Sequence, residues 1–385
     1  MAITPSGDII LSGFERHHPS ESLLFTRLTS DGTTIWRKTH PITYLSVSPA
    51  PQIALGTDGN IFTSFQFIHT VDLGPQPLFN LSPSPDQGTM LARLDGSSGD
   101  TDWSGVWPLV AATIASAPAA SVFIAVSTPY AMPPIDLGGG PINPVDGNGN
   151  PQTSATLIVN YSGFGSYSWS KQLAAGSGTP PVLIAPGGSP VIQGGFKGSL
   201  LIDGHKLDLP DGVAESPFLA RLDPSGLFIA SRTIDCPNLL AAESPEAVFL
   251  VGYSDYDQWN DCGCGKFALA DGRRALVVSK VDSSLACVWS TSLGTTDIYS
   301  NISVSDAAVD NTGGVVFVLV DNTEPLFPGE PKGGCALARL DSSGTLSLST
   351  RFECDGASAV AVDADSNILV AAHYADGAHI LRFSP

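Results

Sequence analysis

The sequence predicts an all-β fold made of seven copies of one four-stranded unit. A short signature, clearest as Ala220–Asp223 (ARLD), recurs along the chain, and its seven copies end at residues 29, 95, 160, 223, 282, 341 and 384, which are 43 to 66 residues apart. Charged residues make up only 14% of the 385 residues, and the 40 Gly and 30 Pro suit many short strands and tight turns. No segment shows a sustained 3.6-residue apolar period, so almost no helix is expected.

The first two strands of each unit are short and apolar. The first is built from small residues, as in Ala359–Val362, and a polar turn such as Asp363–Asn367 follows it. Asp, Asn and Gly in that turn supply local hydrogen bonds and positive φ angles. The second is the most apolar run of the unit, as in Val248–Gly252. An unbroken apolar strand is expected where neighbouring sheets cover both of its faces.

The third strand carries the Arg-Leu-Asp signature, and the fourth carries tryptophan in four copies. These tryptophans are Trp36, Trp103, Trp169 and Trp289. We expect them to pack as wedges between adjacent units, and the alternative is that they stack on a ligand.

Four antiparallel strands per unit, repeated in series, describe a β-propeller. Seven second strands and seven third strands predict seven blades within a single domain over residues 1–385. The approximate units are 1–40, 41–108, 109–175, 176–234, 235–293, 294–352 and 353–385. Because the last copy reaches Pro385 straight after its third strand, either the last blade has three strands or the N-terminal residues complete it.

Charge and hydropathy exclude two classes of partner. The chain is acidic, with a formal net charge of −19, and its 18 Lys and Arg form no basic patch of the kind that binds nucleic acid. No apolar run approaches the roughly 18–20 residues that a membrane-spanning helix needs. The sequence therefore predicts neither a nucleic-acid partner nor a membrane span.

The six cysteines all lie in the second half of the chain. They are Cys236, Cys262, Cys264, Cys287, Cys335 and Cys354. An even number in successive units favours disulfides formed in an oxidising compartment, and the alternative is a set of buried free thiols. We expect at least one disulfide, with Cys262 or Cys264 as a participant. Zinc is not expected, because Cys262 and Cys264 lack a second close Cys or His pair.

The disulfides lead to the prediction of a secreted or cell-surface protein. Residues 1–5 show neither the basic region nor the apolar core of a signal peptide. Because the chain opens directly on a repeat unit, we do not take that lack as a sign of a cytoplasmic protein.

The repeat resembles that of bacterial β-propeller proteins common in myxobacterial cell-envelope and secreted fractions. Units of that family read as a strand, then DLGGGP, then a polar stretch, then ARLD and a later tryptophan. Val71–Pro75 (VDLGP) and Ile135–Pro141 (IDLGGGP) match the first half, and Leu201–Gly204 echoes it loosely. The resemblance implies the architecture and the location, and it carries no catalytic motif to this chain.

One segment also resembles the tryptophan-docking motif of quinoprotein propellers. Ala92–Trp103 (ARLDGSSGDTDW) has the Asp–Gly–Trp spacing of that motif. We interpret it as a way of docking one blade on the next, without a quinone cofactor.

No catalytic motif stands out. The chain has no Gly-x-Ser-x-Gly elbow, no His-x-x-x-His pair and no phosphate-binding glycine loop. If the small apolar strands are innermost, only Glu243 and Asp306 bring charge to the channel wall, and neither has an obvious partner. The expected function is a non-enzymatic extracellular or cell-surface binding or scaffold module. The alternative is a propeller enzyme (a lyase, a glycosidase or a quinoprotein-like enzyme) with its site at the mouth of the central channel.

The connections between the second and third strands vary most in length, as is usual for a recognition face carried on a rigid scaffold. The alternative is neutral drift in loops that tolerate insertion. The best segment combines aromatic and acidic residues: Tyr253, Asp255, Tyr256, Asp257, Trp259, Asn260 and Asp261. A protein or saccharide ligand is expected there. No cofactor is expected, although Asp255, Asp257 and Asp261 are weak candidates for calcium.

Overall fold

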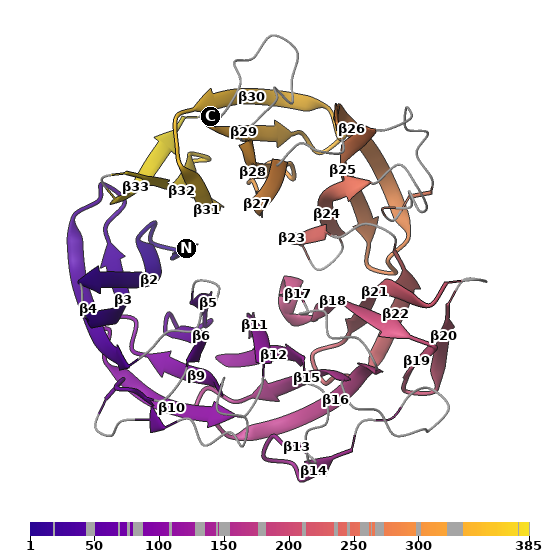
Figure 1. Ribbon diagram of the computed structural model, residues 1–385, viewed down its shortest axis with the longest axis horizontal. Helices are drawn as coiled ribbons and strands as arrows, with labels where there is room; N and C mark the ends of the chain where they lie inside the picture. The colour runs from indigo at the N-terminus through magenta and orange to yellow at the C-terminus, as the bar shows by residue number, and fades with distance from the viewer. Residues whose placement is uncertain are drawn as a thin grey trace. The chain divides into compact units, whose positions relative to one another are not determined.

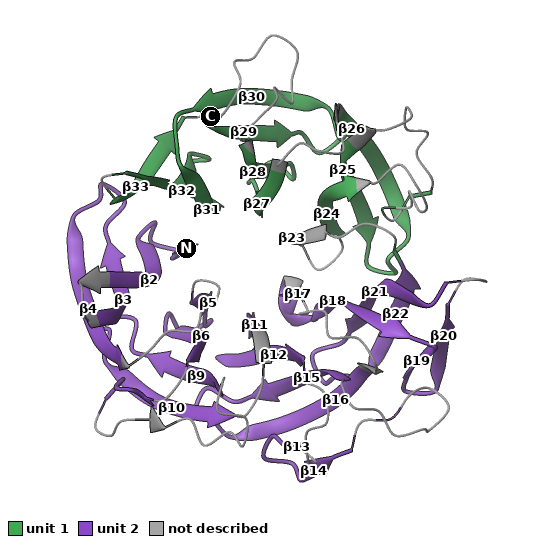
Figure 2. Cartoon of the chain, in the orientation of Figure 1, with its two compact units in different colours: residues 1, 234–385 green, residues 2–233 purple. Residues whose placement is uncertain are grey.

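The computed structural model describes most of the chain in two compact units, one of residues 2–233 and one of residues 234–385 with Met1 (Figure 2). The described residues are 1–17, 20–43, 51–67, 70–74, 78–79, 88–107, 110–127, 135–143, 145, 155–175, 182–209, 213–234, 238–244, 247–254, 262, 264–265, 273–297, 302–321, 334–375 and 377–384.

The unit of residues 2–233 contains four blades, each with four antiparallel strands in order from the inner to the outer edge (Figure 1). Blade 1 has β1 (Ala2–Ile3), β2 (Ile9–His17), β3 (Ser20–Leu28) and β4 (Thr34–Thr43). Blade 2 has β5 (Gln52–Leu55), β6 (Ile61–Phe67), β9 (Gly88–Leu94) and β10 (Thr101–Trp107). Blade 3 has β11 (Val110–Ala117), β12 (Ser121–Ser127), β15 (Ala155–Tyr161) and β16 (Tyr167–Ala175). Blade 4 has β17 (Val182–Ile184), β18 (Val191–Lys197), β21 (Glu215–Leu222) and β22 (Phe228–Thr233).

The other unit contains three blades, and the last of them has only three strands. Blade 5 has β23 (Asn238–Ser244), β24 (Ala247–Ser254), β25 (Arg273–Asp282) and β26 (Cys287–Asp297). Blade 6 has β27 (Ile302–Val309), β28 (Val315–Asp321), β29 (Gly334–Leu340) and β30 (Leu346–Phe352). Blade 7 has β31 (Gly356–Val362), β32 (Ile368–Tyr374) and β33 (Gly377–Phe383).

These sheets confirm the predicted fold class, a seven-bladed β-propeller of mostly four-stranded antiparallel blades. The described residues contain no α-helix, and a single 3₁₀ turn occupies Pro186–Gly188. The N-terminal strand β1 pairs with β2 as the inner strand of blade 1, with Ala2 opposite Ile10. Blade 7 is therefore the three-stranded blade that the sequence left as one of two possibilities. No helix in the described part of the chain is long and apolar enough to cross a membrane.

Three connections between second and third strands carry short extra strands at the rim. They are β7 (Thr70–Val71) with β8 (Leu78–Phe79), β13 (Ile135–Asp136) with β14 (Pro141–Ile142), and β19 (Ser199–Ile202) with β20 (His205–Asp208). β7 pairs with β4, the outer strand of the preceding blade, with Val71 opposite Ile42. This connection thus extends the sheet of blade 1 and links it to blade 2.

The second strands form the core of each unit. Every residue of β6 is buried, including the polar Thr63, Ser64 and Gln66, as expected for a strand that is covered on both faces. Phe123 of β12 and Phe196 of β18 lie in one apolar cluster, and Phe249 of β24 and Phe317 of β28 lie in another. Each cluster spans two adjacent blades, so burial of these phenylalanines holds the blades together.

Two disulfides are described, and both lie in the unit that contains blades 5 to 7. Cys264 bonds to Cys287, and Cys335 bonds to Cys354. Cys262 is also disulfide-bonded, whereas Cys236 lies outside the described residues. The prediction of at least one disulfide with Cys262 or Cys264 is confirmed, and among the described cysteines none is free.

Candidate ligand groove

Each tryptophan of a fourth strand packs on a glycine in the turn of the next blade. The pairs are Trp36 with Gly99, Trp103 with Gly165, Trp169 with Gly226, and Trp289 with Gly344. All four glycines have positive φ. A Cβ at these glycines would lie 2.8 to 3.0 Å from the indole atoms, so only glycine admits the ring. This packing confirms that the tryptophans are wedges between blades.

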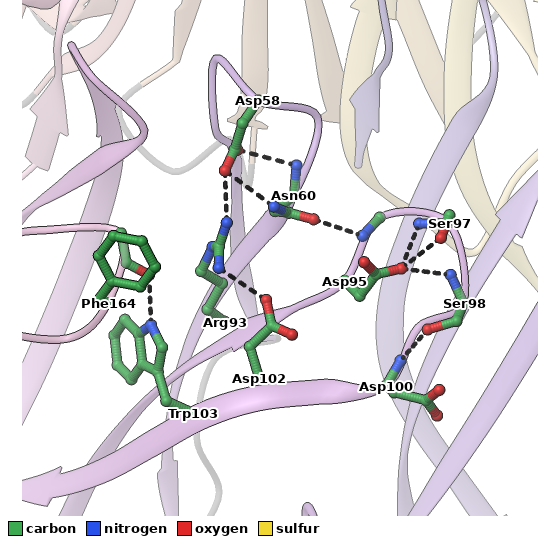
Figure 3. A network of polar contacts seen from close by, with 12 residues as sticks. Asp58, Asn60, Arg93, Asp95, Ser97, Ser98, Asp100, Asp102, Trp103 and Phe164 are labelled. Atoms are coloured by element: carbon green, nitrogen blue, oxygen red, sulfur yellow. Dashed lines mark hydrogen bonds and ion pairs between the residues drawn. The ribbon is translucent and has the colours of Figure 1, made fainter.

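Hydrogen bonds fix three of these rings in place. The Nε1–H groups of Trp36, Trp103 and Trp289 donate to the carbonyl oxygens of Gly96, Gly163 and Ser342, over 3.1, 2.7 and 3.0 Å. The docking interpretation of the Ala92–Trp103 segment is thereby confirmed, because its tryptophan binds the turn of blade 3 (Figure 3).

The arginine of the repeat signature is structural as well. In four blades it reaches back to an aspartate in the turn between the first and second strands of its own blade. The pairs are Arg27 with Asp8 at 2.6 Å, Arg93 with Asp58 at 2.5 Å, Arg339 with Asp310 at 2.6 Å, and Arg382 with Asp363 at 3.1 Å. The signature arginine therefore joins the third strand of a blade to the turn between its first two strands, which is a structural role.

A network of polar contacts makes the turn between β9 and β10 rigid (Figure 3). One carboxylate oxygen of Asp95 accepts hydrogen bonds from the backbone N–H groups of Ser97 and Ser98 and from the Ser97 hydroxyl. The backbone N–H of Gly96 donates to Asn60 Oδ1 over 2.9 Å. Hydrogen bonds from Ser97 and Ser98 lower the pKa of Asp95, so this carboxylate stays ionised and the turn stays ordered.

That turn forms one wall of a groove at the rim of blades 1 and 2. The groove has a volume of about 420 Å³. Its lining residues come from three segments: Lys38, Thr39, His40 and Pro41 of β4, Asp72, Leu73 and Gly74 after β7, and Gly99, Asp100 and Thr101 at the start of β10. We call these ten residues the rim groove. Its volume is within the range of natural small-molecule sites.

A salt bridge crosses the rim groove between the two blades. Lys38 Nζ lies 2.7 Å from Asp100 Oδ1. The hydrogen bond from Lys38 lowers the pKa of Asp100, and a second from Ser98 acts in the same direction. The groove therefore holds an ammonium and a carboxylate side by side, both partly open to solvent.

His40 lines the groove, but its Nε2 atom is buried in the protein. Its Nδ1 lies 3.1 Å from the carbonyl oxygen of Asp72, which places the proton on Nδ1. Nε2 is buried without a hydrogen-bond partner, and the ring makes an edge contact with Phe25. Burial lowers the pKa of His40, so the imidazole is neutral near pH 7.

The Asp-Leu-Gly motif anchors the third segment of the groove. Leu73 is buried, and the Thr101 hydroxyl donates to its carbonyl oxygen. In blade 3 the same arrangement recurs: Leu137 is buried, and the Tyr161 hydroxyl donates to its carbonyl oxygen over 2.7 Å. The motif is thus an anchor for the long connection, and in blade 2 it places the exposed Asp72 in the lining of the groove.

The predicted binding segment falls almost entirely outside the described residues. Asp255, Tyr256, Asp257, Trp259, Asn260 and Asp261 are all outside them. Tyr253 is described, and it packs partly buried against the core cluster that contains Phe249 and Phe317. The calcium candidates thus lie outside the described ranges, within which no group of three or more His, Cys, Asp or Glu could hold a metal ion.

Sequence reasoning missed the rim groove. Asp72 and Asp100 each lie in a motif that the sequence did single out, but nothing in the sequence shows that the two motifs meet across a blade boundary.

Asp306, for which the sequence offered no partner, accepts hydrogen bonds from the backbone N–H groups of Ala307 and Val360 over 2.9 and 2.8 Å. It therefore links the first strands of blades 6 and 7.

Comparison with known proteins supports the fold alone. No family model matches the chain, and no curated protein matches its sequence. The β-propeller domain of the Trilobed protease from Pyrococcus furiosus, described as having an open velcro topology, is similar with 9% identity and a TM-score of 0.50. The match covers 99% of this chain and 90% of that one. A protein from Lactobacillus plantarum is similar with 11% identity and a TM-score of 0.50, over 97% of this chain and 91% of that one.

Proposed function

We propose that the protein is a non-enzymatic binding module and that the rim groove binds a short saccharide. The observation that carries the proposal is the pair of Lys38 and Asp100, whose charged groups lie 2.7 Å apart in a groove of about 420 Å³. A carboxylate accepts and an ammonium donates hydrogen bonds, so the pair complements two adjacent sugar hydroxyls. Asp72 and Thr39, which also line the groove, add a carboxylate and a hydroxyl as further polar partners.

The same groups are poorly suited to acid–base catalysis. A general acid or base works best with a pKa near the operating pH and with its reacting atom within reach of the substrate. Asp100 has a lowered pKa, and the Nε2 atom of His40 is buried. These features support binding without turnover.

A secreted or cell-surface location belongs to the same proposal. The two described disulfides support it, because such bonds persist in oxidising compartments. The resemblance of the repeat to bacterial cell-envelope proteins supports it as well.

The 253–261 segment is proposed as a second contact, for a protein or saccharide ligand and with calcium as a candidate ion. Its interleaved aromatic and acidic residues support this reading. If Asp257→Ala and Trp259→Ala both leave every detected ligand unaffected, this segment is ordinary surface.

The rim-groove proposal is tested with a saccharide panel read by thermal shift and by isothermal titration calorimetry. Removal of the carboxylate in Asp100→Asn or Asp72→Asn should weaken a saccharide that binds the wild type about tenfold, the loss of one good hydrogen bond to a charged group. Asp208→Asn is the matched control, since Asp208 pairs with Lys206 on β20 and does not line the groove.

Three outcomes would contradict the proposal. The first is that no saccharide binds, and the second is that Asp208→Asn weakens binding as much as Asp100→Asn. The third is turnover in a hydrolase and lyase screen, which would favour a propeller enzyme instead.

A further inference from the structure

Among the described residues, β33 is the outer edge strand of the blade 7 sheet. Blades 1 to 6 each pair their third strand with a fourth, whereas within the described residues no strand pairs with the outer side of β33 (Figure 1). The third strands also differ in how deeply they are buried. The third strands β9 and β15 are almost wholly buried, but in β33 four of seven residues are exposed and none is buried.

The backbone groups that point outward along this edge can be assigned from the pairing register. Tyr374 and Gly377 lie opposite each other with two residues between them in the chain, and from this spacing we take them as a hydrogen-bonded pair. Hydrogen-bonded pairs alternate along an antiparallel ladder. The N–H and C=O groups of Ala378, Ile380 and Arg382 therefore point away from β32.

β33 also lacks the features that usually protect an edge. Natural edges are blunted by proline, lysine or a β-bulge. In every four-stranded blade the pairing between third and fourth strands contains a bulge or register shift. The pairing of β33 with β32 runs over seven residues without one, and β33 contains neither proline nor lysine.

We propose that β33 binds an extended segment of another protein, which adds as the fourth strand of blade 7. The six fourth strands of blades 1 to 6 are examples of strands that pair with a third strand of this repeat, so their sequences indicate which residues such a partner needs. Five of the six have a bulky apolar residue at their third position: Trp36, Trp103, Trp169, Trp289 and Leu348. Four positions after the third, five of the strands have a large residue (His40, Trp107, Leu173, Leu293 and Phe352), and Ile234 follows directly after the end of β22. The partner is therefore an extended peptide with a bulky apolar residue followed, four positions on, by a second large one.

The register of blade 6 shows how this peptide aligns. In β30, Leu348 lies opposite Arg339, Thr350 opposite Leu337 and Phe352 opposite Cys335. Arg339 and Arg382 occupy the same place in the repeat signature, so the bulky residue of the partner lies opposite Arg382. Its second large residue lies opposite Ala378, where the small side chain leaves room.

The probe is a synthetic peptide of residues 345–353 (TLSLSTRFE), the chain's own strand from blade 6, with a fluorophore at its N-terminus. Binding is measured by fluorescence anisotropy. In the register above, residue 350 of the peptide donates to the edge and residue 349 does not. A Thr350→Pro peptide should bind at least about tenfold more weakly, since it loses a central ladder hydrogen bond, whereas a Ser349→Pro peptide should lose much less.

The matched protein variants are Ile380→Pro and Ile380→Ala. Proline at position 380 removes an outward N–H and leaves the pairing with β32 intact, so the melting temperature should stay near that of the wild type. Its affinity for the peptide should fall at least about tenfold, while that of Ile380→Ala falls less than about threefold.

Amide hydrogen exchange gives the independent readout. The amides of Ala378, Ile380 and Arg382 should exchange fast in the free protein and slow down when the peptide binds, while those of His379, Leu381 and Phe383 should be protected throughout. Protection of all six in the free protein, equal binding by both proline peptides, or a dimer that Ile380→Pro dissociates would overturn the proposal. In the last case the occupant is a second copy of the chain.

Discussion

Gly344 and Trp289 pack so closely that a side chain at position 344 would overlap with the indole ring. A Cβ on Gly344 would lie 2.9 Å from the indole ring, and the backbone at Gly344 has a φ of 86°. The same ring donates a hydrogen bond to the carbonyl oxygen of Ser342, two residues earlier in the turn. Trp289 thus contacts the turn of the next blade in two ways, by packing on Gly344 and by a hydrogen bond to Ser342.

Coupling between these two residues is the first prediction. Gly344→Ala should destabilise the protein by about 1–3 kcal/mol through positive φ and overlap with the ring, and Trp289→Leu by about 2–4 kcal/mol through lost packing. Because Trp289→Leu removes the ring that an alanine would meet, the double variant should lose less than the sum. The measurement is chemical denaturation of the four proteins as a double-mutant cycle. Strict additivity would contradict the packing described here.

The disulfide between Cys335 and Cys354 should hold blade 6 to the segment before blade 7. It closes a loop with a sequence separation of 19 residues. Loop-closure entropy predicts that the Cys335→Ala/Cys354→Ala double variant loses about 3 kcal/mol of unfolding free energy. The measurement is urea denaturation with and without reductant. Reductant should destabilise the wild type more than the variant, and an equal effect on both would show that this bond contributes little.

The fold could be predicted from sequence because its determinants are local and repeated. The apolar run of β24, the polar turns and the Arg-Leu-Asp signature each describe one strand or one turn, and seven copies reinforce the assignment. The role of Trp103 could be predicted for the same reason, since a tryptophan at the same place in four copies indicates a contact that belongs to the repeat.

The rim groove could not be predicted because its residues meet only through blade docking. Lys38 and Asp100 are 62 residues apart and belong to different blades. Their proximity depends on where the turn of blade 2 lies against β4, which the wedge of Trp36 and the pairing of β7 with β4 determine. The sequence instead directed attention to the 253–261 segment, where aromatic and acidic residues are adjacent in the chain and no folding is needed to bring them together.

His40 should make stability depend on pH near neutrality. Burial of its ring lowers the pKa in the folded protein, while the unfolded chain titrates near 6.5. The unfolded state therefore binds the proton more readily, so stability is complete above about pH 6.5 and falls as the pH decreases towards the folded-state pKa. The charged groups around the ring are Lys38, Asp72 and Asp100.

The check is the free energy of unfolding measured between pH 5 and 8 for the wild type and for His40→Gln. The variant should show a smaller loss over the acidic half of that range. Identical pH profiles for the two proteins would show that His40 titrates normally.

Asp310 should dominate acid sensitivity in blade 6. Burial alone would raise the pKa of Asp310, but hydrogen bonds from Thr312, Gly314 and Arg339 outweigh it and hold the pKa below its usual range. A depressed carboxyl pKa gives stability that is present above about pH 3.8 and is lost as the pH falls through the folded-state value. The expected result is steeper acid unfolding for the wild type than for Asp310→Asn.

At pH 7 the same variant should lose about 2–4 kcal/mol, because the Arg339 guanidinium is left without the carboxylate that it approaches to 2.6 Å. Asp341→Asn is the control, since this carboxylate caps a solvent-exposed turn of the same blade through Ser343 and Thr345. Its loss should be clearly smaller. The two variants are compared by their free energy of unfolding, measured by urea denaturation at pH 7. A comparable loss in both would mean that the hydrogen bonds within the Asp310 turn, rather than the ion pair with Arg339, account for the stability that Asp310 contributes.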